Sequence, residues 1–399
     1  MSFLKPKLYL RKFFRSFFYI LSPIFLIILI LIYPFKLIRF GFLPSDRMGE
    51  IAIIMEIYLA NKFRKLNIPN KPFIDIFIYG DIEANYTYNN LLRSKICVLS
   101  NIVVFPIYRL IKFLSKSLEF FNRFIIDLPF KDKFLSISQT DVQLKVDQKF
   151  IDRGNEFLKK IGISPKDKII CLIVRDKAYL DKKYPERNWE YHNFRDCNIE
   201  NFKEAINFAT DRGYYVFRMG EFVEKHLDIK NEKFIEYSRD YRTDFLDIYL
   251  AYRCSFCLST STGYDVIPGF TFRKPVLFTN FVPAGDFLSF SKNFIFSIKL
   301  HYDSIKKKFL TIKDISEYNL SYSFNSKEYI EKNVKLIENT PEEIKQMTEE
   351  MIDVIENKST NSDIDKNMQE KFWRIYNKYF DFDHMFNKNI SKIKKKFLL

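Results

Sequence analysis

The spacing of apolar residues along the chain predicts two series of strands and helices, preceded by one long apolar run. In the first series, the apolar stretch Lys36–Leu43 is short enough for a buried strand, and an amphipathic helix is expected over Glu50–Lys65. Two further strands are expected, at Phe73–Gly80 and Lys95–Ser100. Strands and helices in this order are typical of βαβ units with parallel sheets.

The second series follows a polar passage, Pro129 to Asp167, that contains a helix-like segment at Asp141–Ile161. Its expected strands are Lys168–Asp176, Tyr214–Gly220, a short one at Lys233–Ser238, Ser255–Gly263 and Lys274–Asn280. Its expected helices are Ile199–Arg212, Asp244–Arg253, a helix opened by Thr340-Pro341-Glu342-Glu343, and Ile364–Phe380. The alternation predicts a parallel, doubly wound sheet.

These patterns predict an α/β fold made of four parts. We expect a basic and hydrophobic membrane anchor at residues 1–35, Rossmann-like domains at 36–150 and 151–357, and a C-terminal helix with a basic tail at 358–399. A chain of 399 residues with 47% apolar residues is long enough for two domains with separate cores.

The N-terminal apolar run, Phe17–Pro34, carries no charge and follows a basic cluster of Lys5, Lys7, Arg11, Lys12 and Arg15. Its length is at the lower edge of the roughly 17–25 residues that cross a bilayer, and no small-residue cleavage site follows it. A full span would leave the basic cluster in the cytoplasm and export the rest of the chain. Because Pro23 removes a helix hydrogen bond and the basic helix suits anionic lipids, we expect an in-plane anchor. A true span and a buried core helix remain alternatives.

The net charge of +15 suits an anionic partner, but lysine is abundant together with Ile, Asn, Phe and Tyr, and scattered charge is typical of a solvated surface. Five cysteines at irregular spacings do not predict a disulfide framework, which favours a reducing compartment. Cys254 and Cys257 form a Cys-x-x-Cys pair in an apolar run, without a second ligand pair nearby. We expect them to pack in the core.

Polar residues follow three expected strands of the second series. Arg175 and Asp176 close one strand, Arg218 and Gly220 close the next, and the turn Ser259-Thr260-Ser261-Thr262-Gly263 closes a later one. Ligands of open parallel sheets bind beyond the carboxyl ends of the strands. Two guanidinium groups, with hydroxyls and backbone amides at a helix N-terminus, suit a diphosphate. The sequence therefore predicts an anion-binding site, with surface salt bridges and ordinary turn chemistry as alternatives.

The loop before the first helix supplies Arg47, Gly49 and Glu50. Gly49 allows close backbone approach, and Glu50 stands at the start of the helix. A carboxylate there can take the proton from an acceptor hydroxyl, so Glu50 is the first candidate for a catalytic base and Glu56 the second. The alternative is that an acid in the first turn merely complements the helix dipole.

A polar loop in the second series contains Tyr191-His192-Asn193-Phe194-Arg195-Asp196. The chain has four histidines, and His192 beside Arg195 is a candidate acid, base or phosphate contact. Tyr191 and Arg195 are candidate substrate contacts. A structural role for the histidine is the alternative. No metal is expected, because no Asp-x-Asp element ends a strand and no histidines are paired.

The order of these motifs resembles a bacterial glycosyltransferase family found with surface-polysaccharide and O-antigen gene sets. Between Arg39 and Ile355 the chain carries R-M-G, V-R-D, Y-H-x-x-R-D, G-Y-x-V-x-R-M-G, D-F-L-D-I-Y-L, S-T-S-T-G, K-P-V and T-P-E-E-I. The resemblance implies a GT-B-like fold, with two Rossmann-like domains facing a cleft and the nucleotide sugar held by the C-terminal one. It implies an acceptor-side role for Gly49 and Glu50, and donor-site roles for Arg175, Arg218, Gly220, Thr260, Ser261, Thr262 and Gly263.

Two positions depart from the family pattern. The family often has histidine where Glu50 stands, and it has Ser-Gly where this chain has Thr262-Gly263. The first departure concerns the catalytic base, whereas the second keeps a hydroxyl group in the turn.

The resemblance implies transfer of a sugar from a nucleotide-sugar donor to a glycan or lipid-linked acceptor in cell-surface polysaccharide biosynthesis. No cofactor is expected besides the donor substrate. An in-plane anchor formed by the N-terminal hydrophobic segment would place the enzyme on the cytoplasmic face of the bacterial inner membrane, where nucleotide sugars are available. The alternative is a non-catalytic glycan- or anion-binding protein at the membrane surface. Nucleic acid is not an expected partner, because the aromatic residues fall within apolar runs rather than between lysines.

Overall fold

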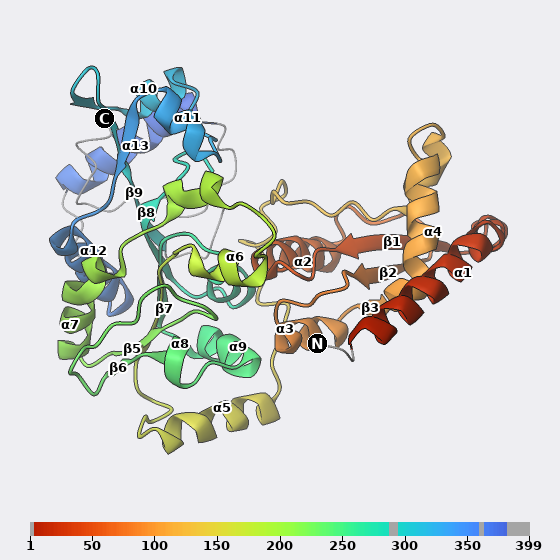
Figure 1. The fold of residues 1–399 in the computed structure, drawn as a ribbon, viewed down its shortest axis with the longest axis horizontal. Helices are drawn as coiled ribbons and strands as arrows, with labels where there is room; N and C mark the ends of the chain where they lie inside the picture. Colours follow the sequence, from red (N-terminus) through yellow and green to blue (C-terminus); the bar gives the residue numbers. More distant parts are fainter. Residues whose placement is uncertain (1–3, 287–293, 359–362, 381–399) are drawn as a thin grey trace. The chain divides into compact units, whose positions relative to one another are not determined.

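The computed structural model describes residues 4–286, 294–358 and 363–380 of the chain (Figure 1). The chain divides into two compact units, unit 1 over Met1–Phe130 and unit 2 over Lys131–Leu399. The division therefore falls within the polar passage that begins at Pro129, before the helix expected in that passage.

Unit 1 contains a three-stranded parallel sheet in the order β1-β2-β3. Its strands are β1 (Leu37–Leu43), β2 (Phe73–Tyr79) and β3 (Cys97–Leu99), which confirms the three strands predicted from the apolar runs. The other elements after β1 are α2 (Met48–Phe63), α3 (Tyr86–Arg93), α4 (Asn101–Leu114) and the 3-10 helix η1 (Glu119–Phe124).

A buried ion pair joins the two longer strands of this sheet. Arg39 of β1 and Asp75 of β2 are register partners, and Arg39 Nε lies 2.7 Å from Asp75 Oδ1. The hydroxyl of Tyr58 donates to Asp75 Oδ2 over 2.5 Å. Because a shift of one residue would leave two charges unpaired in the core, the pair favours this single register.

The first helix, α1 (Leu4–Ile32), continues through Pro23. Proline cannot donate to the carbonyl of Tyr19 one turn earlier, and the hydroxyl of Ser22 donates to that carbonyl instead, over 2.8 Å. By length and composition, α1 is the one helix among the described residues that can cross a membrane, although core helices and signal sequences share these properties.

The two sides of α1 have different surroundings. Leu26 and Leu29 are buried in a core cluster that includes residues of α4, and the two helices lie side by side in Figure 1. A second row of apolar side chains at intervals of three and four residues is exposed: Phe13, Phe17, Ile20, Ile24, Ile27 and Leu31. This spacing places the row on one side of the helix, so the structure leaves an apolar stripe uncovered.

Unit 2 contains a six-stranded parallel sheet in the order β6-β5-β4-β7-β8-β9. The strands are β4 (Ile169–Ile173), β5 (Tyr215–Arg218), β6 (Phe234–Ile235), β7 (Phe256–Ser259), β8 (Val276–Phe281) and β9 (Phe294–Ile298). From the central strand β4, the next strands β5 and β6 follow on one side, and β7, β8 and β9 follow on the other side. This is the Rossmann strand order, and its direction reverses between β4 and β7.

Helices cover both faces of this sheet. The elements between β4 and β7 are α6 (Ala178–Lys183), η2 (Glu190–Arg195), η3 (Ile199–Phe202), α7 (Lys203–Asp211), α8 (Tyr237–Asp240) and α9 (Asp244–Arg253). Helix α12 (Pro341–Ile355) packs with α7 in one core cluster (Figure 1). Helix α5 (Gln148–Lys160) contacts α9, where a Cβ on Gly154 would lie 2.0 Å from the Tyr249 ring. Only glycine therefore fits that contact.

Several elements of unit 2 were not predicted from the apolar pattern. A small antiparallel sheet in the order β11-β10-β12 contains β10 (Leu300–Asp303), β11 (Lys308–Phe309) and β12 (Val334–Ile337), with α10 (Ile312–Glu317) and α11 (Ser326–Glu331) between them. The expected C-terminal helix is α13 (Asp363–Tyr379), and its side chains Phe372 and Tyr376 are fully buried. The lysine-rich tail, Lys388–Lys396, lies outside the described residues.

The cysteines of the predicted core pair are free thiols. Cys254 and Cys257 are buried, as is Cys171 of β4. Burial raises the pKa of Cys171 and of Cys257 well above the ordinary thiol value. Cys254 and Cys257 are therefore core residues, which confirms the packing prediction.

Candidate functional site

The ends of β4 and β7 meet where the strand order of unit 2 reverses. The backbone amide of Arg175, just after β4, donates to Oγ1 of Thr260, just after β7, over 2.8 Å. The amide of Thr260 donates to the carbonyl of Ile173 over 3.3 Å. Ligands of Rossmann sheets bind at this reversal point, so the structure brings two predicted site residues to the expected place.

Two guanidinium groups lie close together there. Arg195 Nη2 donates to the carbonyl of Ser261 over 2.6 Å, and Arg175 Nε lies 3.4 Å from Asp196 Oδ1. Burial lowers the pKa of Arg195 to about 10, with the charge of Arg175 as the second cause, and burial likewise lowers the pKa of Arg175. The Nε atoms of Arg175 and Arg195 are buried and make no hydrogen bond among the described residues. Two adjacent cations, of which Arg195 makes no ion pair among the described residues, form a site suited to an anion.

The loop that carries Arg195 is fixed from a distant part of unit 2. Lys299 is almost fully buried, and its Nζ donates to the carbonyls of Phe194 and Asp196 over 3.1 and 2.6 Å. The hydroxyl of Ser326 accepts from the amide of Phe194 over 3.2 Å and donates to the carbonyl of Glu190 over 3.0 Å. These contacts hold the backbone on both sides of Arg195. Sequence reasoning missed Lys299 and Ser326, since neither stands near a motif.

A buried carboxylate organises the turn from Ser259 to Gly263. Asp265 Oδ2 accepts from the Ser259 hydroxyl over 2.5 Å and from the amide of Thr262 over 2.5 Å. The amide of Ser261 donates to the Ser259 hydroxyl over 3.0 Å, and Ser261 has a positive φ of 64°. The amides of Thr262 and Ser261 are thus used within the turn, and the amide of Thr260 is bound to β4.

The structure corrects the predicted role of this turn. We expected its amides to lie at a helix N-terminus and to face an anion, but the next element is the five-residue π-helix η4 (Ile267–Thr271), which is buried. Asp265, which the sequence analysis missed, accepts from the amide of Thr262, and the amides of Ser261 and Thr260 are bound to the Ser259 hydroxyl and the Ile173 carbonyl. The turn therefore positions Arg195 through the carbonyl of Ser261 rather than cradling the ligand itself.

Arg218, Gly220 and Asp176 also differ from their predicted roles. Arg218 is fully buried, and its guanidinium donates to the carbonyls of Met219 and Val174. Asp176 accepts from the amides of Ala178 and Glu224, each over 3.0 Å. Gly220 has a φ of 150°, and a Cβ there would lie 2.6 Å from Val223. Arg218 and Asp176 therefore fix the backbone after β4 and β5, because their side chains bind backbone carbonyls and amides of unit 2.

Aromatic rings surround His192 on η2. The ring centroids of His192 and Tyr191 are 4.1 Å apart, and His192 stacks on Trp189 at 6.1 Å with an interplanar angle of 21°. The Tyr191 side chain is 40% exposed. The predicted cluster Tyr191–Asp196 thus contains an aromatic stack a few residues before Arg195. Tyr191 is the member of this stack that faces the solvent.

The remaining predicted residues lie in unit 1. Gly49 is buried in the first turn of α2, and Glu50 Oε1 accepts from Arg47 Nη1 over 2.6 Å. Glu50 lines an open groove of about 550 Å³ formed by residues of unit 1 alone. Glu56, the second candidate base, is fully buried. Of the two carboxylates, Glu50 is therefore the one that a substrate can reach.

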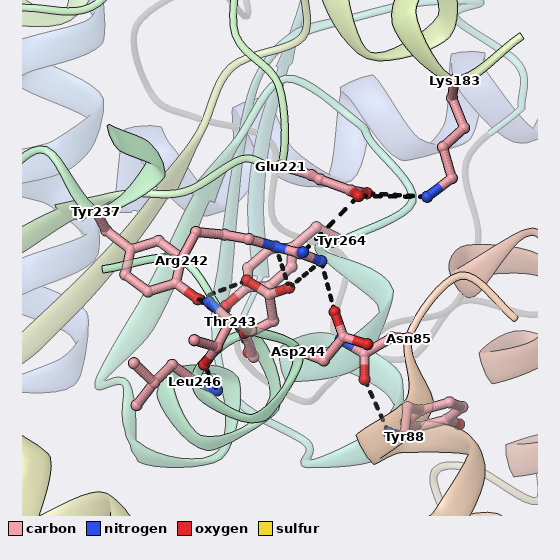
Figure 2. Close-up of polar contacts among 11 residues, drawn as sticks. Asn85, Tyr88, Lys183, Glu221, Tyr237, Arg242, Thr243, Asp244, Leu246 and Tyr264 are labelled. Atoms are coloured by element: carbon pink, nitrogen blue, oxygen red, sulfur yellow. Dashed lines mark hydrogen bonds and ion pairs between the residues drawn. The ribbon is translucent and has the colours of Figure 1, made fainter. Parts of the chain in front are cut away.

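A charged network in unit 2 was not predicted as such (Figure 2). Arg242 Nη2 lies 2.9 Å from Asp244 Oδ1 and 3.0 Å from Asp247 Oδ2, and its Nη1 lies 3.7 Å from Glu221 Oε1. Asp247 is 7% exposed and accepts from the Tyr237 hydroxyl over 2.7 Å. Burial raises the pKa of Asp247 to about 6. Asp247 is thus an interior carboxylate stabilised by Arg242.

No protein-family model matches the chain, and no curated protein matches it. Its fold is similar to that of the E. coli ADP-heptose LPS heptosyltransferase II, with 12% identity, 61% of this chain and 87% of that chain covered, and a TM-score of 0.33. It is also similar to the fold of a glycosyl transferase family 9 protein from Veillonella parvula DSM 2008, with 9% identity, 61% of this chain and 79% of that chain covered, and a TM-score of 0.34. A UDP-N-acetylglucosamine 2-epimerase has 13% identity, with 82% of this chain and 98% of that chain covered, and a TM-score of 0.31. Likeness this low does not establish an activity for the chain.

Proposed function

We propose that the chain is a glycosyltransferase and that unit 2 binds the diphosphate of a nucleotide-sugar donor. The observation that carries the proposal is the pair of partly buried guanidiniums, Arg175 and Arg195, at the reversal point of a Rossmann sheet. A diphosphate would place its anionic oxygens beside the two guanidinium groups and neutralise their charge. Tyr191 offers an exposed ring for the rest of the nucleotide.

The transfer forms a bond between an acceptor oxygen and the anomeric carbon and breaks the bond from that carbon to the diphosphate. The acceptor proton passes to a base, for which Glu50 is the first candidate and His192 the second. The departing nucleoside diphosphate takes the bonding electrons, and Arg175 and Arg195 neutralise the charge that develops on it. With both guanidiniums in this role, we propose that the reaction needs no metal ion and no cofactor.

We further propose that the enzyme works on the cytoplasmic face of the bacterial inner membrane, in cell-surface polysaccharide biosynthesis. The uncovered apolar stripe on α1 supports membrane attachment. Nucleotide sugars are made in the cytoplasm, which favours an anchor that leaves both units on that side. The acceptor in this proposal is a glycan or a lipid-linked glycan.

The test is a binding and turnover screen of the purified full chain against UDP-, GDP-, ADP- and CMP-sugars. Arg175→Ala and Arg195→Ala should each weaken donor binding by about 10- to 100-fold, the effect of losing a charged hydrogen bond. Arg187→Ala is the matched control, because the Arg187 side chain is 57% exposed and paired only with its neighbour Glu186 in the ion pairs of the described residues. Unchanged donor binding in both site variants would refute the proposed diphosphate site.

The alternative function is a non-catalytic anion- or glycan-binding protein at the membrane. The same screen separates the two functions. Binding of a nucleotide sugar without hydrolysis or transfer to any glycan or lipid-linked acceptor would favour the alternative.

A further inference from the structure

The open groove of unit 1 has a mostly apolar lining. Its apolar residues are Phe42, Pro44, Ile54, Tyr108, Ile125, Ile126, Leu128 and Phe130. Its volume of about 550 Å³ falls within the range of about 300–1,000 Å³ that is usual for small-ligand sites. An apolar trough of this size suits a hydrocarbon chain better than a hydrophilic sugar.

Three charged side chains stand on the lining. Glu50 is paired with Arg47, and Asp127 Oδ2 accepts from Asn67 Nδ2 over 3.4 Å. Lys112 is exposed and makes no ion pair among the described residues; its Nζ lies 5.8 Å from the centroid of the Tyr108 ring. The groove therefore offers one cation, Lys112, that a phosphate group can neutralise, and one carboxylate, Asp127, that makes no ion pair among the described residues.

Helix α4 connects the groove to the apolar helix α1. Val104, Ile107 and Ile111 of α4 share a core cluster with Leu26 and Leu29 of α1. Tyr108 belongs to the same cluster and also lines the groove, together with Lys112 one helical turn later. The cluster that holds α1 therefore extends to the lining of the groove.

The charge of unit 1 is consistent with a membrane location for the groove. Residues 1–130 contain 18 lysines and arginines against eight acids, a net charge of +10 out of +15 for the whole chain. Most of the excess positive charge thus lies in the unit that carries α1. Anionic lipid surfaces attract such a basic segment.

We propose that this groove binds the hydrocarbon chain of a lipid-linked acceptor, with the lipid phosphate paired to Lys112 and the acceptor hydroxyl on the Glu50 side. The proposal rests on the proposed glycosyltransferase function and names its acceptor class. A chain bound beside α1 can enter from the membrane, and each buried methylene strengthens binding by about fourfold until the groove is filled.

The experiment uses the full chain in bilayer discs of phosphatidylcholine and a long-chain alkyl phosphate that carries a photoreactive diazirine near its terminal methyl group. After irradiation, mass spectrometry locates the label. We expect labelled peptides from residues 42–54 and 122–130, and competition by unlabelled alkyl phosphates that strengthens with chain length and then levels off. Label confined to α1 and the exposed side of α4 would overturn the proposal.

Two variants are designed to fill the groove. If one of them fails to fold, the other still tests whether the lipid probe binds in the groove. Leu128→Trp and Ile125→Trp place an indole into half-buried lining positions and should each reduce groove labelling at least tenfold. Phe113→Trp is the matched control, because Phe113 is 68% exposed on α4 and does not line the groove. Equal labelling in all four proteins would overturn the proposal.

A further arm identifies the ligand. Lys112→Gln should weaken competition by alkyl phosphates more than competition by the uncharged alkyl alcohols of the same length. Equal groove labelling by a diacyl phosphatidylglycerol probe would overturn the acceptor assignment, since it would indicate a bound membrane lipid. Groove labelling without donor binding would refute the proposed function alone, whereas donor turnover without groove labelling would refute the lipid site alone.

Discussion

The backbone amide of Arg175 and the side-chain oxygen of Thr260 are joined by a 2.8 Å hydrogen bond that spans the ends of β4 and β7. Thr260 is 2% exposed, so this bond forms away from water. It ties the residue that carries one guanidinium to the turn whose carbonyl at Ser261 holds the other, Arg195. The Thr260 hydroxyl is thus one of the contacts that fix the separation of the two guanidinium groups proposed to bind the diphosphate.

Replacing Thr260 with valine should weaken both the fold and the donor site. Valine keeps the shape of threonine but leaves the amide of Arg175 without its acceptor, at a cost of about 1–3 kcal/mol in the free energy of unfolding. Donor affinity should fall as well, because the position of Arg175 is no longer fixed. Chemical denaturation and donor titration measure the two effects. Thr260→Ser keeps the acceptor and should retain most of the donor affinity; equal losses in both variants would contradict this explanation.

Asp265 should make the stability of unit 2 depend on pH in a defined direction. Burial raises its pKa to about 6, from about 4 in an unfolded chain. The folded state therefore binds the proton more tightly, and the stabilising contribution is complete below about pH 4 and is lost as the pH rises through about 6. Asp265→Asn removes this titration. Relative to the wild type, its free energy of unfolding should rise by about 2–3 kcal/mol between pH 4 and pH 7.

Denaturant unfolding at several pH values checks the prediction for Asp265. The exposed Asp228, whose side chain is 94% accessible, provides the control variant Asp228→Asn. The control should follow the wild type at every pH. A constant difference between Asp265→Asn and the wild type from pH 4 to pH 7 would show that Asp265 does not titrate as described.

Removing Arg242 should destabilise unit 2 strongly. Arg242→Met keeps much of the side-chain volume but leaves the buried Asp247 without its ionic partner (Figure 2). Breaking one side of a buried ion pair costs about 3–5 kcal/mol. Thermal or denaturant unfolding measures the loss, and the added change Asp247→Asn should recover part of it. Arg239→Met, at a half-exposed ion pair with Asp240, should have little effect. Similar stabilities for Arg242→Met and Arg239→Met would contradict this role.

Much of the sheet architecture could be predicted because it depends on local patterns. The strands at Ile169–Ile173, Phe256–Ser259 and Val276–Phe281 are buried along their whole length, and continuous apolar runs of that length are typical of parallel sheets. The helix Asp244–Arg253 has the bounds that its sequence indicated, with Thr243 as its N-cap. The short strands β10, β11 and β12 carry no comparable signal, since they are two to four residues long.

The arrangement of the candidate site was harder to predict because it depends on contacts distant in sequence. Arg175 follows β4 and Arg218 ends β5, yet Arg218 is fully buried and donates to the carbonyls of Met219 and Val174, whereas Arg175 pairs with the carboxylate of Asp196. Lys299 is separated from Arg195 by about a hundred residues, and nothing near it in the sequence indicates that it holds the Arg195 loop. Asp265 lies two residues beyond the turn Ser259–Gly263, and nothing in the sequence indicates that its carboxylate accepts from the Thr262 amide.

Glu50 should be needed for turnover but not for donor binding, if it is the base of the proposed transfer. Glu50→Gln keeps the size of the side chain and its ability to accept from Arg47, but it cannot take a proton from the acceptor. Because general base catalysis contributes about 10²- to 10⁴-fold, kcat should fall by that factor while the Kd of the donor stays unchanged. Steady-state kinetics with donor titration separates the two quantities. Arg47→Gln is the control, since it breaks the same ion pair and leaves the carboxylate in place. If Arg47→Gln lowers kcat as much as Glu50→Gln does, the ion pair matters and proton transfer by Glu50 is refuted; if neither lowers it, His192 becomes the base to test next.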